Sequence, residues 1–322
     1  MNTTPHPYRR LAFVAAKGAV VALVVWGVHR TINAAISDLA ENAWSPSELN
    51  VGWLIVSGVV YLASLFPSAW FWHRILVTLG QQPHLGESVR AYYIGHLGKY
   101  VPGKALVVVM RATMVRSRRT GAAVAAAAVF FETLTMMAAG SFVSGALLVF
   151  WFRHQTWLML VALAMMLASG LPTLPPVFHY VVKFIARRKG DPAAFAQLTR
   201  LGYGTLALGW LGMSVGWLLN GLSLYLVIGA CGFSITPEAV ERYILCTIAG
   251  AMSVVVGFIS FIPGGAIVRE AVLMFLLPPR FGQLAAVVSA IMVRLVSIVA
   301  ELVISAILYC TGPSPVDRSD VA

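Results

Sequence analysis

The chain of 322 residues is far more apolar than a soluble domain, because 59% of its residues are hydrophobic, only 11% are charged, and its mean hydropathy is +0.82. Soluble domains carry about 25% charged residues, so the composition excludes them and predicts an all-α polytopic membrane protein. The net charge of +11 then indicates basic cytoplasmic loops and anionic lipid, and we expect no nucleic-acid partner. The three cysteines have no paired spacing, so neither a disulfide framework nor a metal site is expected.

Apolar runs near the roughly 20 residues that a helix needs to cross a bilayer predict six full spans. They cover residues 11–29, 51–79, 120–152, 157–186, 203–231 and 283–310. Two further apolar regions, 85–117 and 237–278, are interrupted by Pro-Gly sequences, "VPGK" at 101–104 and "IPGG" at 262–265. A broken helix survives at membrane depth only inside protein or beside a water-filled cavity. Each region is therefore predicted to be a re-entrant helical hairpin.

The two breaks suggest an internal repeat, because Pro102 and Pro263 lie 161 residues apart, which is half of the 322-residue length. At the same offset, "AAVAAAAVFFET" aligns with "LAAVVSAIMVR". The pattern predicts a single membrane domain over residues 1–322, with repeat halves 9–152 and 157–311 that each contain two spans, a hairpin and a span. Three crossings and a hairpin that returns to its own side would insert the second half upside down, so we expect an inverted repeat.

Basic residues concentrate on the side of the membrane that this topology gives to the termini. They are Arg9, Arg10, Arg74, Arg90, Lys99, Lys104, Arg111, Arg116, Arg118, Arg119, Lys183, Arg187, Arg188, Lys189 and Arg200. The first loop on the opposite side carries Asp38, Glu41 and Glu48 with only Arg30 beside them. Because cytoplasmic loops are enriched in Lys and Arg, we expect an inner-membrane protein with both termini in the cytoplasm.

Ionisable side chains within membrane segments cost about 2.5 to 3.5 kcal/mol each on insertion scales, which makes them candidates for a binding site or a pathway. The candidates are Lys99, Lys104, Arg111, Glu132, Arg269, Glu270, Arg294 and Glu301. Lys104 and Arg111 are seven residues apart and share a helix face, while the break before Lys104 would expose backbone N–H groups that favour anions. We therefore predict an anion site at Lys99, Lys104 and Arg111. The alternative is that these side chains only snorkel to the interface.

Glu132 lies well inside a predicted span and needs a buried partner. Arg294, next to the repeat-equivalent position, is the predicted partner, and such a pair can be functional or purely structural. Arg269 and Glu270 are adjacent and face different directions on a helix, so they cannot form one simple pair. Glu301 can reach a neighbour that the sequence does not identify.

The motifs "LGKYVPGK" and "FIPGGAIVREA", with an acidic residue in the span after the first and an Arg in the last span, resemble the membrane domain of lysylphosphatidylglycerol synthase/flippase proteins. The resemblance covers nearly the whole chain and implies a lipid-translocating fold with two re-entrant elements. The residues that match the two motifs are Lys99, Tyr100, Pro102, Gly103, Lys104 and Arg111, then Pro263, Gly264, Gly265, Arg269 and Glu270. Thr133 departs from the family, which would place a basic residue after the acidic one, and no soluble aminoacyl-transferase domain accompanies the motifs.

Together with the resemblance, these features predict a lipid flippase that moves a phospholipid or a lipid-linked headgroup across the bilayer and receives the anionic or zwitterionic headgroup in a central polar cavity. The expected substrate-binding residues are Lys99, Tyr100, Gly103, Lys104, Arg111, Glu132, Gly264, Gly265, Arg269, Glu270 and Arg294. Transport is expected to be facilitated or ion-coupled, without a cofactor, and with Glu132 or Glu270 as candidate proton sites. The alternatives are a non-transporting lipid-binding partner of a separate lipid-modifying enzyme and, third, a membrane enzyme, although His96 alone supplies no acid-base or nucleophile set. Neither the particular lipid nor the oligomeric state follows from the sequence.

Overall fold

A computed structural model describes most of the chain. The residues it describes are 26, 29, 49–101, 105–116, 120–151, 156–177, 179–180, 200–236, 238–260, 262, 265 and 267–311. The predicted span 11–29 therefore lies outside the described residues except for Trp26 and His29. So do Pro102, Gly103 and Lys104 of the first break.

The described residues form helices and no β-strand, which confirms the all-α class. The α-helices are α2 (Val51–Thr78), α3 (Leu85–His96), α4 (Ala105–Val115), α5 (Ala122–Trp151), α6 (Thr156–Gly170), α9 (Tyr203–Ala230), α10 (Ala239–Ile259), α11 (Val268–Leu276), α12 (Pro278–Phe281) and α13 (Gln283–Thr311). Short 3-10 helices are η2 (Leu97–Tyr100) and η3 (Leu171–Thr173). Within this part of the chain, α2, α5, α9, α10 and α13 are long and apolar enough to cross a membrane. The chain is thus a polytopic membrane protein.

Four of the predicted spans, 51–79, 120–152, 203–231 and 283–310, are single helices whose ends differ from the prediction by one or two residues. The region 237–278 folds as two helices in contact, α10 and α11. However, the first of these has 21 residues, and at 1.5 Å per residue it is about as long as the bilayer core is thick. This helix is therefore long enough to be a full crossing, and not only the arm of a short hairpin.

The predicted span 157–186 is interrupted in the structure. Helix α6 ends at Gly170 and a 3-10 turn with Pro172 follows. Proline lacks the backbone N–H that continues a helix, and Pro175 and Pro176 follow within the next few residues. The high hydropathy of this region predicted one continuous span, although the prolines interrupt the helix.

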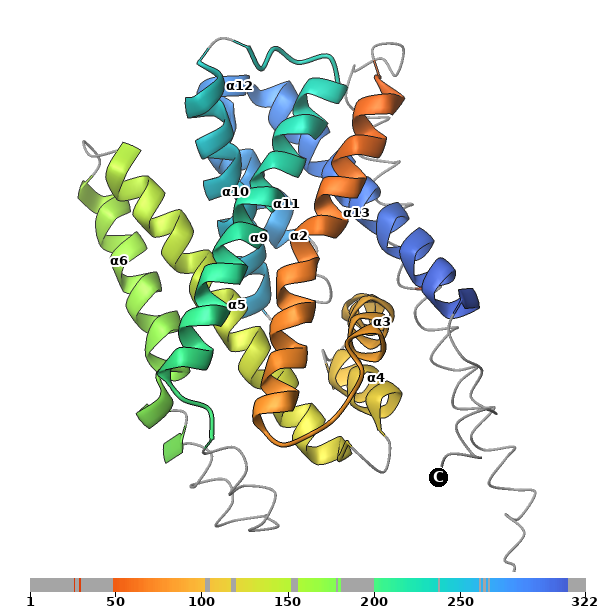
Figure 1. Ribbon diagram of the computed structural model, residues 1–322. Helices are drawn as coiled ribbons and strands as arrows, with labels where there is room; N and C mark the ends of the chain where they lie inside the picture. The colour runs from red at the N-terminus through yellow and green to blue at the C-terminus, as the bar shows by residue number, and fades with distance from the viewer. Residues whose placement is uncertain are drawn as a thin grey trace, which may run out of the picture.

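Helices α2 and α9 form a close antiparallel pair in the middle of the molecule (Figure 1). The contacting residues repeat every seven positions along both helices: Ser57 with Ser223, Ser64 with Gly216, and Phe71 with Gly209. A seven-residue spacing keeps these contacts on one helix face. A Cβ at Gly216 would lie 2.7 Å from the carbonyl oxygen of Ser64, so the glycine is what allows the two backbones to approach.

The remaining contacts have the same pattern in both halves of the chain. In the first half, α2 contacts α3 and α5, and α4 contacts both α3 and α5. In the second half, α9 contacts α10 and α13, and α11 contacts both α10 and α13. In Figure 1, α2 and α9 run in opposite directions, and so do α5 and α13. These observations support the predicted inverted repeat, in which α2, α3, α4 and α5 would correspond to α9, α10, α11 and α13. Helix α3 is seen nearly end-on in the same view, so it runs across the long helices.

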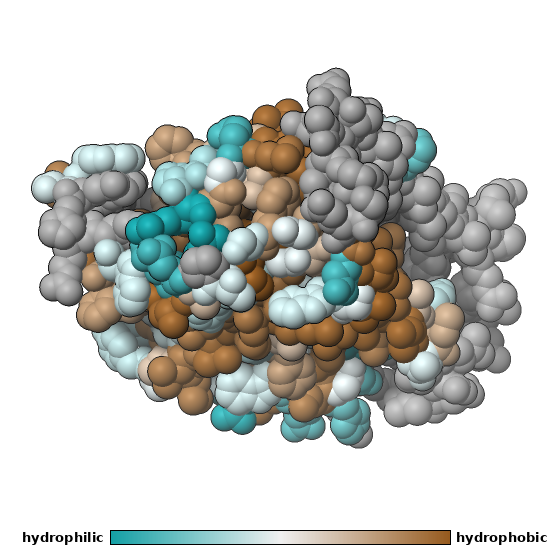
Figure 2. All heavy atoms as spheres, turned by 90° about the horizontal axis from the view of Figure 1, so that it is seen from above, coloured by the Kyte–Doolittle hydropathy of each residue, from teal (hydrophilic) through white to brown (hydrophobic). Residues whose placement is uncertain are grey.

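Charged side chains tie the α9–α10 connection to α12 at one end of the molecule. The guanidinium of Arg280 binds the carboxylates of Glu238, at 3.1 Å, and Glu241. Next to them, the guanidinium of Arg242 lies 5.1 Å from the centre of the Phe281 ring. Figure 2 looks down on this end and shows hydrophilic side chains gathered among hydrophobic ones.

Candidate functional site

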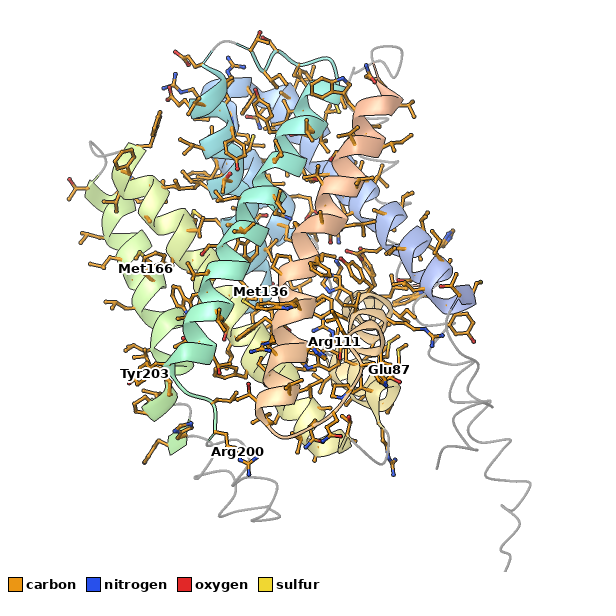
Figure 3. The ribbon with its side chains drawn as sticks, in the orientation of Figure 1. Glu87, Arg111, Met136, Met166, Arg200 and Tyr203 are labelled. Carbon is orange, nitrogen blue, oxygen red and sulfur yellow. The ribbon has the colours of Figure 1, made fainter. Side chains whose placement is uncertain are left out.

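A buried ion pair joins α4 to α5. Arg111 Nη1 lies 3.0 Å from Glu132 Oε2, and the two side chains are only 3% and 0% exposed. The hydroxyls of Tyr92 and Thr133 also donate to the Glu132 carboxylate, and the guanidinium carbon of Arg111 lies 3.7 Å from the centre of the Tyr92 ring. A Cβ at Gly95 would meet Arg111 Cγ at 2.6 Å, so this glycine leaves the space that the arginine occupies. Figure 3 labels Arg111 within the side chains packed around α3 and α4.

The predicted pairing of Glu132 with Arg294 is wrong. Arg294 on α13 binds Glu270 on α11, and both of these side chains are 15% exposed. In each half, the last span therefore binds the second helix of the hairpin region before it: α5 binds α4, and α13 binds α11. Repeat-equivalent positions indicate similar surroundings and do not imply that the two positions touch. The prediction that Arg269 and Glu270 face different ways is confirmed for Glu270, whose partner is Arg294.

The third buried carboxylate, Glu301 on α13, collects donors from the first half of the chain. Its side chain is 1% exposed, and its Oε1 lies 2.5 Å from Lys99 Nζ. The hydroxyls of Tyr61 and Tyr100 donate to the same carboxylate, that of Tyr100 over 3.0 Å. This cluster fixes the turn η2, which precedes the first Pro-Gly break, against the last helix of the chain.

His96 connects the ion pair of Glu132 to the cluster around Glu301. Its Nε2 lies 3.7 Å from Glu301 Oε1, and its Nδ1 lies 3.4 Å from Arg111 Nη2. The imidazole also stacks on the Tyr92 ring, with 6.0 Å between the ring centres. The ion pairs of Glu132 and Glu301 therefore belong to one continuous polar network that crosses the interior.

Arg269 lies in the first turn of α11. Unlike Lys99, Arg111 and Arg294, it forms no ion pair with a carboxylate of the described residues. It is half-buried, and it lies close enough to His96, Lys99 and Tyr100 to act on them electrostatically. Two glycines make room for its aliphatic stem, because a Cβ at Gly257 or Gly265 would meet Arg269 at 2.7 or 2.9 Å. Gly265 also has a φ of +66°, which side chains with a Cβ rarely adopt.

The described interior thus contains more positive than negative charge. Each of the three carboxylates, on Glu132, Glu270 and Glu301, has one cationic partner. Arg269 is the additional cation. Such a site favours a ligand that brings a negative charge.

Apart from Arg269, the predicted site residues fall into four groups. Lys99 and Tyr100 bind Glu301 and lie within electrostatic reach of Arg269. Arg111, Glu132, Glu270 and Arg294 bind one another in two pairs, and Arg111 is too deeply buried to meet a ligand directly. Gly103, Lys104 and Gly264 lie outside the described residues. The position of Gly265 is explained by the stem of Arg269.

Sequence reasoning missed Tyr61 and left His96 without a role. Tyr61 lies in the middle of an apolar span, where a single hydroxyl is an ordinary feature. The available signal was Glu301, a carboxylate in a span that had to be satisfied by hydrogen-bond donors. Its partners come from positions more than 200 residues away in sequence, so only the fold identifies them.

The fold and the site together define a class: an all-helical membrane protein in which charged side chains are buried around breaks between helices. The family described as lysylphosphatidylglycerol synthase TM region matches residues 14–305. The chain belongs to this family, which confirms the resemblance noted in the two Pro-Gly motifs and makes it a membrane protein of a lipid-related family. A search of curated proteins finds no match.

Proposed function

We propose that the protein is a flippase that moves an anionic membrane lipid across the bilayer, with the headgroup bound at Arg269 and at Lys99, which lies within electrostatic reach of Arg269. The observation that carries this proposal is the excess cation of the interior. An unmatched guanidinium in a low-dielectric region is costly unless an anion accompanies it. A lipid phosphate would supply that anion through charge-assisted hydrogen bonds worth roughly 1.5 to 3 kcal/mol each.

The charge balance also distinguishes among lipid headgroups. Each of the three interior carboxylates among the described residues already binds a cation, so none carries an unbalanced negative charge for the ammonium group of an aminoacylated lipid, and the acceptor that stays without a hydrogen bond is the single oxygen Glu270 Oε2. Although the family is named for a lysylated lipid, the proposed substrate is therefore an unmodified anionic phospholipid. The proposed role is transport and involves no covalent chemistry.

The proposal also includes the orientation of the protein in the membrane. Arg74, Arg116 and Arg200 lie near the ends of α2, α4 and α9 at one end of the molecule, where Figure 3 labels Arg200. Glu238 and Glu241 lie at the opposite end, where Arg242 and Arg280 balance their charges. By the positive-inside rule, the basic end would face the cytoplasm of a cell whose inner membrane holds the protein.

The experiment is a flux assay with the purified full chain in liposomes that contain fluorescent phosphatidylglycerol or fluorescent lysylphosphatidylglycerol. An external reductant bleaches the outer leaflet, so continued bleaching measures flipping. We expect faster flipping of phosphatidylglycerol than in protein-free liposomes, a loss of about tenfold or more in Arg269→Gln, and wild-type rates in Arg280→Gln, which removes a peripheral cation. Flux equal to that of protein-free liposomes would overturn the proposal. Lipid binding without flux would instead support the non-transporting alternative.

A further inference from the structure

An open groove of about 450 Å³ lies beside the charged site, between the start of α6, the middle of α10 and one face of α11. Its wall includes Trp157, Met252, Val268, Ala271 and Phe275, and it is apolar throughout. The volume falls in the range of small-molecule binding sites, about 300 to 1,000 Å³. An apolar wall gives water no hydrogen-bond partners, so a hydrocarbon is the natural content of this groove.

Helix α11 separates the groove from the charged site and contributes to both. Val268, Ala271 and Phe275 are spaced by three and four residues and therefore share one face. Glu270 points away from that face, since it binds Arg294 of α13. Arg269 lies at the edge of the face, because its stem packs against Gly257 of α10 and because Val272 and Leu276, three and seven residues after it, also line the groove. The first turn of this nine-residue helix thus places an unmatched cation directly next to the beginning of an apolar groove.

The residue before the helix marks where the two regions meet. Ile267 is 77% exposed and lines the groove, although it immediately precedes the turn that carries Arg269. A small soluble anion could use the cation but not the groove, whereas an apolar molecule could use the groove but not the cation. The combination matches a ligand with a charged head and a hydrocarbon chain.

We infer that the groove holds an acyl chain of the same lipid whose anionic headgroup binds Arg269. The inference rests on the proposed function and adds a binding site for one hydrocarbon chain of its anionic lipid substrate. The chain passes Ile267 and lies along the outer face of α11, while the headgroup stays on the inner side of that helix. The protein thereby recognises both parts of the lipid with one short helix.

Binding measurements by native mass spectrometry of the purified full chain test this inference. The probes are dioleoylphosphatidylglycerol and its dihexanoyl analogue, which has the same headgroup and short chains. Ala271→Trp fills the groove, and because Ala271 is exposed the larger ring does not enter the packed core. Val303→Trp, at a 53% exposed position on α13, is the matched control.

We expect the wild type to bind the dioleoyl lipid at least tenfold more tightly than the dihexanoyl lipid. Ala271→Trp should remove most of that difference, Arg269→Gln should weaken both lipids, and Val303→Trp should bind as the wild type does. Equal affinity of the wild type for both lipids, or wild-type affinity of Ala271→Trp for the dioleoyl lipid, would overturn the inference. If the variants change lipid binding as expected but the protein moves no lipid, the proposed transport is refuted and the acyl-chain site is supported. If the protein moves lipid and Ala271→Trp binds the dioleoyl lipid as the wild type does, only the acyl-chain site is refuted.

A second measurement does not depend on filling the groove. Trp157 is 55% exposed at the groove, so bromine atoms on a bound acyl chain should quench its fluorescence. In detergent, the quenching of the wild type minus that of Trp157→Phe should saturate at one brominated lipid per protein. In Arg269→Gln the same quenching should require a higher lipid concentration. Quenching that is the same in both proteins, or that never saturates, would contradict a chain bound in the groove.

Discussion

Replacement of Glu132 by Gln tests the buried ion pair that joins α4 to α5. The change removes the negative charge but keeps the shape of the side chain. The Arg111 side chain, which is only 3% exposed, then has a buried guanidinium without its carboxylate partner. Breaking a buried pair by removal of one partner costs about 3 to 5 kcal/mol. At 1.36 kcal/mol for each factor of ten, the folding equilibrium should fall by roughly a hundredfold or more. Arg111→Gln should cost a similar amount, because Glu132 is then the buried charge without a partner.

The double variant distinguishes direct contact from independent damage. With both charges gone, neither is left buried alone, so Glu132→Gln with Arg111→Gln should recover about 2 to 3 kcal/mol relative to the sum of the single variants. The assay is reversible unfolding of the purified protein by SDS in mixed micelles, followed by circular dichroism. A second cycle, Glu132→Gln with Arg294→Gln, should be additive within about 0.5 kcal/mol. Additivity in the first cycle, or strong coupling in the second, would refute the assignment of partners.

Two further predictions concern packing and topology. Gly216→Val should destabilise the protein by about 1 to 3 kcal/mol in the same unfolding assay, because a Cβ there would lie 2.7 Å from the Ser64 carbonyl oxygen. Gly204→Ala, which has nothing within 4 Å of the added carbon, should not destabilise the protein, because Ala is the better helix former. In a cysteine-free background, Arg116→Cys should react with an impermeant maleimide only in inverted vesicles and Glu238→Cys only in intact cells. Reaction of both from the same side would contradict the proposed orientation.

The positions of the long helices followed from hydropathy alone because apolar length is a one-dimensional property. The four confirmed spans are uninterrupted runs, and their lengths fit the thickness of a bilayer. The proline-rich end of α6 and the full length of α10 were harder to predict. In both regions hydropathy stays high across the break, so the end of the helix is set by local backbone chemistry at Pro172 or near Gly265.

The site was predictable in its residues and not in its contacts. Burial in the membrane selects ionisable side chains that need partners, and this reasoning found Lys99, Glu132, Arg269 and Glu301. It could not choose among partners, because the choice depends on which helices pack side by side. Lys99 and Glu301 are separated by 202 positions, and no local pattern in the sequence connects them.

The two halves of the chain contain the same ion-pair arrangement with the signs exchanged. In the first half the hairpin arm α4 carries the cation Arg111 and the following span carries Glu132. In the second half the arm α11 carries the anion Glu270 and the following span carries Arg294. The attraction between two charges depends on their product, so either arrangement can hold the arm against the span. This repetition favours a structural role for both pairs.

The contacts that have no counterpart in the other half are therefore better candidates for substrate binding. At the repeat offset of 161 residues, the positions of Lys99 and Glu301 correspond to Ser260 and Gly140, and neither of these can form an ion pair. Arg269 likewise has no counterpart, since the position 161 residues before it is Val108. A substrate that carries charge breaks the symmetry of an inverted repeat, because its headgroup needs one binding site and not two equivalent ones. Neutralising either repeated pair should therefore reduce stability first, whereas Arg269→Gln should reduce lipid binding while the unfolding midpoint stays close to that of the wild type.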